Sequence, residues 1–62
     1  MFQDELISFL DRHKGYCSAV ELAKAAGVGK NTIYRLRNGE GITIKNWEKI
    51  KLAMDRIEAR AS

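Results

Sequence analysis

A chain of 62 residues closes only one hydrophobic core, and its 45% apolar and 31% charged residues exclude a disordered tail. One Cys and one His exclude an internal disulfide and a zinc site, and no apolar run approaches the roughly 18 residues of a membrane span. We therefore expect a single domain over residues 1–62, with no cofactor and no membrane contact. Acidic residues near the N-terminus, where a signal peptide is basic, favour the cytoplasm.

The net charge of +3 is concentrated in the middle of the chain. Residues 16–46 hold five Lys or Arg side chains against two acidic ones, whereas residues 1–15 hold three acidic and two basic ones. A basic surface suits a polyanion partner, although a charge of this size is also common in ordinary domains.

The first expected helix spans about residues 3–13. Apolar side chains follow the i, i+4, i+7, i+8 spacing of an amphipathic helix, and Gly15 can end it. This face consists of Phe2, Leu6, Phe9, Leu10 and His13. His13 and Cys17 have no partners for catalysis or metal binding, so we interpret His13 as a structural residue and Cys17 as a packing residue.

A second helix is expected to begin near Ala19 and to end at Gly27. Ser18 and Glu21 match the S-x-x-E capping box, in which the serine oxygen and the glutamate carboxylate each take up a free amide at the helix start. Glycine ends the helix because it readily adopts the left-handed conformation. A helix of about eight residues is not stable alone, so it must pack on its neighbours.

A third helix is expected over about residues 30–37, followed by a turn at 38–41. Ile33 and Leu36 give the apolar spacing of one helical turn, and Asn38 and Gly39 favour the turn after it.

The last expected helix spans about residues 44–59, with Thr43 as its cap and Ile42 packed on Trp47 as a hydrophobic staple. At about 100° per residue, one side is apolar and the opposite side is basic. The apolar arc consists of Ile44, Trp47, Ile50, Ala53, Met54 and Ile57, and the opposite side of Lys45, Lys49, Leu52, Arg56 and Arg60. Residues 42–44 alternate like a strand, but three residues do not decide the matter. The expected fold class is all-α, a compact bundle of four short helices.

The segment from Ser18 to Arg37 has the pattern of a helix-turn-helix. Two helices that are joined by a short turn and cross at a steep angle need a small residue where their backbones meet, a flexible residue in the turn, and apolar residues that pack between them. Ala23, Gly27 and Val28 supply these features.

Four residue pairs in and just after this segment resemble the Cro/C1 type of helix-turn-helix found in phage repressors and related bacterial regulators. These pairs are Leu22-Ala23, Gly27-Val28, Thr32-Ile33 and Asn38-Gly39. The resemblance covers about residues 16–56. The chain departs from the family pattern at Ala19, where the family often has glutamine, and at Gly29, where it commonly has serine.

The resemblance implies a lambda repressor-like DNA-binding domain that acts as a small transcriptional regulator, such as a repressor, of phage or prophage type. Its expected partner is double-stranded DNA carrying a two-fold symmetric operator, bound by a homodimer with residues 30–37 in the major groove. No small-molecule effector is expected, because the chain has no second domain.

With Ile33 and Leu36 facing the core, the outward side of the third helix is expected to read DNA bases. The side chains assigned to base edges are Lys30, Asn31, Tyr34 and Arg35. The residues assigned to phosphates are Ser18, Gly29, Thr32, Arg37, Asn38 and Lys45.

Two other functions stay open at this point. A helix-turn-helix scaffold can dock on another protein, as an antitoxin or antirepressor does, or it can bend DNA in an architectural role such as phage excision. An enzyme is not expected, since one His, one Cys and no glycine-rich phosphate loop leave nothing to assemble into an active site. Leu52 is a candidate contact to a partner subunit.

Overall fold

The computed structural model describes residues 2–61, with side-chain detail to residue 60. These residues form four α-helices and no strand, which confirms the predicted all-α class. The helices are α1 (Phe2–Arg12), α2 (Ala19–Ala26), α3 (Lys30–Arg37) and α4 (Ile44–Ala61). The predicted bounds of α2 and α3 are confirmed. α1 begins and ends one residue earlier than expected, and α4 continues two residues further.

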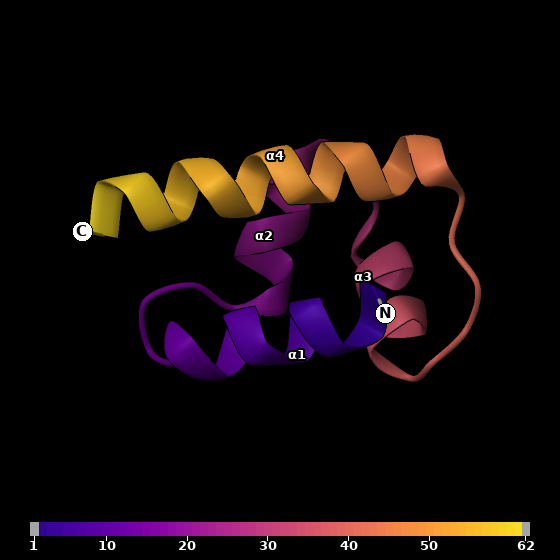
Figure 1. Cartoon of the computed structure of the whole chain (residues 1–62), viewed down its shortest axis with the longest axis horizontal. Coiled ribbons are helices and arrows are strands. Elements are labelled where there is room, and N and C mark those ends of the chain that lie inside the picture. The colour runs from indigo at the N-terminus through magenta and orange to yellow at the C-terminus, as the bar shows by residue number, and fades with distance from the viewer. Residues whose placement is uncertain (1, 62) are drawn as a thin grey trace.

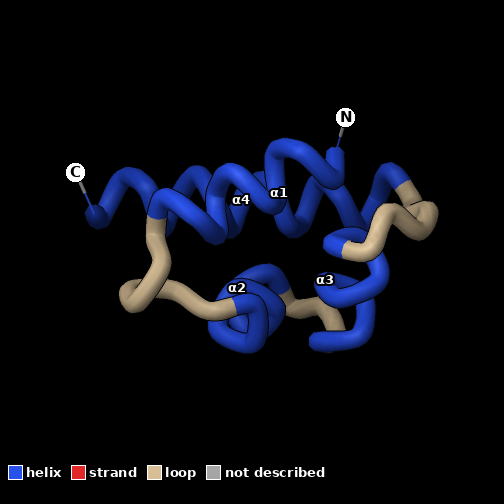
Figure 2. Tube along the Cα trace, turned by 90° about the horizontal axis from the view of Figure 1, so that it is seen from below, coloured by secondary structure: helices blue, strands red, loops and turns tan. Residues whose placement is uncertain are grey.

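The helices are arranged in two layers. α1 and α4 run side by side in the same direction (Figure 1), and Figure 2 shows α2 and α3 together on one side of them. Two ion pairs join α1 to α4: Arg12 Nη2 lies 2.8 Å from Glu58 Oε1, and Lys51 Nζ lies 3.7 Å from Glu5 Oε2. All four side chains are substantially exposed, so these pairs contribute at most about 1 kcal/mol each. The contact between α1 and α4 therefore depends mainly on their buried apolar side chains.

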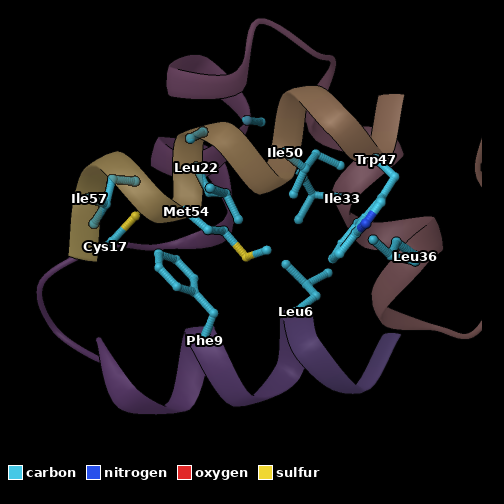
Figure 3. Close-up of a cluster of buried hydrophobic side chains, with 12 residues drawn as sticks. Leu6, Phe9, Cys17, Leu22, Ile33, Leu36, Trp47, Ile50, Met54 and Ile57 are labelled. Atoms are coloured by element: carbon cyan, nitrogen blue, oxygen red, sulfur yellow. The ribbon is translucent and has the colours of Figure 1, made fainter. Parts of the chain in front are cut away.

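The core receives side chains from all four helices. Leu6 and Phe9 project from α1 toward Met54 of α4 (Figure 3), and the largest fully buried side chains are Phe9, Leu6, Leu22, Ile33 and Ile50. The ring of Trp47 stacks on that of Phe2, with 4.5 Å between centroids, and closes the core at the end where the chain begins. Ile42 is partly buried and packs against the same core, while its predicted staple contact with Trp47 stays a prediction.

Local caps explain where α2 and α4 begin. The amide of Glu21 donates to Ser18 Oγ at 3.3 Å, and the amide of Asn46 donates to Thr43 Oγ1 at 3.2 Å. The expected capping box is therefore half confirmed. The other half differs from the prediction. The sequence pattern predicted that the Glu21 carboxylate accepts a hydrogen bond from a backbone amide, but it accepts one from the Ser18 hydroxyl, at 3.4 Å.

Ile44 is a correction to the predicted apolar arc of α4. Its side chain is 61% exposed, whereas the other five members of the arc are buried. Side chains on a helix tilt toward its N-terminus, so a residue in the first turn projects past the end of the core. Ile44 is the first residue of α4, and the core below it is already closed by Trp47 and Phe2.

The turn between α2 and α3 depends on Gly27, which caps α2 in the left-handed conformation with φ 74°. A Cβ at this position would meet nothing within 4 Å, so the cost of Gly27→Ala comes from the backbone alone. We expect this substitution to lower the free energy of unfolding by about 1 kcal/mol, measured by chemical denaturation.

Gly29→Ser is the control for Gly27→Ala, because Gly29 also has open space around it but an ordinary φ of −70°. It should leave stability unchanged or raise it by a few tenths of a kcal/mol, since serine is a good helix cap. Equal destabilisation by both changes would contradict the backbone explanation.

Cys17 is buried, as expected of a packing residue. Burial raises the pKa of its thiol; the carboxylate of Glu21 raises it further, and Arg60 opposes the shift. Because the folded state holds this proton more tightly, its contribution to stability is full below the pKa of the unfolded thiol and is lost as the pH rises from there through the raised pKa of the folded thiol. Iodoacetamide should therefore modify Cys17 slowly at neutral pH and rapidly after denaturant is added. Equal rates would show that the thiol is accessible in the folded chain.

Candidate nucleic-acid interface

The outward side of α3 presents four polar side chains to solvent. Ile33 and Leu36 are 0% and 3% exposed and fix which side of α3 faces the core. The four side chains expected to read bases, which we call the α3 face, are Lys30, Asn31, Tyr34 and Arg35, and all four are exposed. No ion pair or side-chain hydrogen bond within residues 2–61 engages them. They are therefore free to bind an external partner.

The start of α3 favours a negatively charged ligand. Gly29 caps the helix in an extended conformation with no side-chain hydrogen bond, and the first turn contains no acidic residue. The amides of a helix start carry partial positive charge, so the backbone next to Gly29 suits a phosphate oxygen. Of the other residues of this helix assigned to phosphates, Thr32 is partly buried and Asn38, at the opposite end, is exposed.

A basic corner forms where α1, α2 and α3 meet. Ser18 and Arg37, which are far apart in sequence, both line one open pocket of about 340 Å³. Lys14, from the loop after α1, lines it too, and Asp11 is the acidic residue there. We call Lys14, Ser18 and Arg37 the basic corner. Lys14 is a residue that the sequence analysis missed, because no periodicity or motif relates it to the other two.

The end of α3 is held against α1. Gln3 Nε2 donates to the backbone oxygen of Arg37 at 3.0 Å. The side chain of Gln3 also lies over Gly39, where a Cβ would come within 3.3 Å of the Gln3 amide nitrogen and where φ is 87°. This contact fixes the backbone of Arg37, at the end of α3, relative to the start of α1.

Lys45 lies apart from the basic corner. It is exposed on the first turn of α4 and does not line the pocket that Ser18 and Arg37 share. It begins what we call the α4 row, the exposed basic side chains Lys45, Lys49, Arg56 and Arg60. Within the described residues none of the four forms an ion pair, whereas the acidic side chains Glu5, Asp55 and Glu58 pair with Lys51 or Arg12.

Two other kinds of feature, a metal-binding cluster and a membrane-spanning helix, are absent from the described residues. Among residues 2–61, no group of three or more His, Cys, Asp or Glu side chains is gathered closely enough to hold a metal ion. Over the same residues, no helix combines the length and the apolar character needed to cross a bilayer. Comparison with protein-family models, with curated proteins and with solved structures finds no match to this chain.

Proposed function

We propose that the protein is a sequence-specific binder of double-stranded DNA, a small transcriptional regulator in which α2 and α3 form a Cro/C1-type helix-turn-helix with a lambda repressor-like fold. The observation that carries the proposal is the α3 face, whose polar side chains are exposed and have no partner within the described chain. It lies on the second of two short helices that are separated by the three residues 27–29.

The side chains of α3 match the chemistry of the major groove. Asn31 can pair bidentately with adenine, and Lys30 and Arg35 can pair with guanine, each pair being worth about 1 to 3 kcal/mol of discrimination. Recognition helices present their N-terminal residues to bases, which assigns Lys30 and Asn31 to the base pairs nearest the start of α3. Tyr34, 39% exposed, offers its ring and hydroxyl on the same side.

Phosphate contacts would orient this helix on the duplex. The basic corner and the uncapped start of α3 flank the α3 face at its two ends, so they can hold backbone phosphates while α3 lies in the groove. One short helix reads only half a site, and the protein would therefore bind a two-fold operator as a homodimer, with its half-sites about 34 Å apart. A bound dimer would regulate transcription by occluding a promoter.

A selection from random duplexes tests the proposal, followed by titration of the enriched site at two salt concentrations with wild-type protein and Asn31→Ala. We expect a two-fold site. Asn31→Ala should relax the preference at one symmetric base position by about 1 to 3 kcal/mol and leave the salt dependence unchanged. Asn46→Ala, the same change on α4, is the matched control and should alter neither.

A selection that enriches no sequence would contradict the proposal. If no sequence is enriched and the affinity for DNA stays non-specific, a protein-docking role such as that of an antitoxin or antirepressor becomes the better account of the α3 face.

A further inference from the structure

An apolar groove lies where α3 ends and α4 begins. It has a volume of about 310 Å³ and is lined by Phe2, Gln3, Leu36, Gly39, Glu40, Gly41 and Ile42. Ile44, which follows two residues later, is the most exposed large apolar side chain in the described part of the chain, at 61%. We call Phe2, Ile42 and Ile44 the α3–α4 patch; Leu36, which is 3% exposed, lines the groove from the core side. The fold leaves this patch without a covering element.

We propose that the α3–α4 patch is the surface through which two copies of this chain associate about a two-fold axis. The proposal rests on the proposed function, because it names the dimer surface that a two-fold operator requires. In a two-fold contact the same patch is used by both copies, so an apolar patch serves as its own complement. The occupant of the groove is thus the patch of a second copy.

The dimensions of the chain favour this end of the molecule. The described residues extend 30 × 19 × 18 Å, and α3 lies at the end of the long axis where α4 begins (Figure 1). Reading helices that occupy successive turns of one groove lie about 34 Å apart. Contact through the opposite end, where α4 finishes, would separate the two α3 helices by nearly two lengths of the long axis, which is too far for adjacent turns.

The surroundings distinguish the patch from the other exposed apolar site on α4. Leu52 is 57% exposed, but the side chains one helical turn away from it are all charged and exposed, namely Glu48, Lys49, Asp55 and Arg56. A contact centred on Leu52 would bury charged side chains, which is costly. The α3–α4 patch instead adjoins an apolar groove and has opposite charges at its margins, with Glu40 lining the groove and Lys45 following Ile44. A two-fold contact can pair Glu40 of one copy with Lys45 of the other.

The patch also connects dimer formation to the reading helix. Leu36, on the last turn of α3, lines the groove, and so does Gln3, whose amide holds the backbone of Arg37. A second copy bound in the groove would contact the end of α3 and so fix the angle between α3 and the two-fold axis. The distance between the two α3 faces would then be set by this contact.

Ile44→Glu and Leu52→Glu test the proposal as a matched pair. Both side chains are exposed on α4 and equal in size, and a glutamate in the first turn of a helix is favourable, so both variants should fold with wild-type helix content. The mass of the full chain is measured by analytical ultracentrifugation, free and on the duplex enriched in the selection. We expect two chains per duplex for wild type and Leu52→Glu, and one for Ile44→Glu. Affinity of Ile44→Glu should fall at least about tenfold on the two-fold site and stay unchanged on a half-site.

Three results would overturn the proposal: two chains per duplex at wild-type affinity with Ile44→Glu, loss of the second chain with Leu52→Glu alone, or wild-type protein that is monomeric both free and on DNA. If the selection enriches no sequence, the proposed function fails first. Self-association of the free protein then tests the α3–α4 patch separately. If Ile44→Glu abolishes self-association and Leu52→Glu preserves it, the patch is still supported as the contact between two copies.

Discussion

Ile33→Ala is expected to unfold the protein at physiological temperature. Ile33 is fully buried, and Figure 3 shows it in the core cluster beside Ile50, on the side toward Trp47. Truncating a buried isoleucine to alanine costs about 2 to 5 kcal/mol. A domain of this size rarely has more than about 3 to 5 kcal/mol in total, so one substitution removes most of its stability. Thermal unfolding followed by circular dichroism measures the loss.

Tyr34→Ala gives the control from the adjacent position. Tyr34 is 39% exposed on the α3 face, so its removal should leave the thermal transition close to that of the wild type and weaken binding to the selected duplex. The opposite result, an unfolded Tyr34→Ala or a stable Ile33→Ala, would mean that α3 faces the core with a different side.

Helix bounds were predictable where local chemistry sets them. Ser18 and Gly27 define both ends of α2 through their own backbone and side chain, so the sequence was sufficient there. α4 is two residues longer than predicted because no glycine or proline near residue 59 marks an end. Features that depend on packing between distant helices, such as the stack of Phe2 on Trp47, had no local signal.

The same distinction holds for the candidate site. The shared exposure of the α3 face follows from the two buried residues of one short helix, and the helical period was enough to predict it. The basic corner depends on how α1, α2 and α3 pack around one pocket, and so Lys14 was missed while Ser18 and Arg37 were assigned separately. The exposure of Ile44 was missed for a similar reason, since only the packed structure shows where the core ends.

Removing the basic corner should weaken DNA binding without changing which sequence is preferred. Each phosphate contact that is lost lowers the slope of log affinity against log salt by about 0.9. Arg37→Ala and Lys14→Ala should each reduce the slope by about 1, and the double variant by about 2. Titration of the selected and a scrambled duplex over a series of salt concentrations measures both the slope and the preference.

Lys49→Ala is the control for these two variants, because it also removes one positive charge but from the α4 row. It shows whether the change in slope comes from a lost phosphate contact or from the lower net charge. If phosphates are held at the basic corner, this variant keeps the wild-type slope, because exposed charges more than about 10 Å from the duplex are largely screened at ordinary salt. A slope that falls equally with Lys49→Ala would place DNA along the α4 row as well. That row extends along α4 away from α3, so a duplex that contacts both the basic corner and the α4 row would have to bend. Bending would be detected as an electrophoretic mobility that changes with the position of the binding site in the DNA fragment.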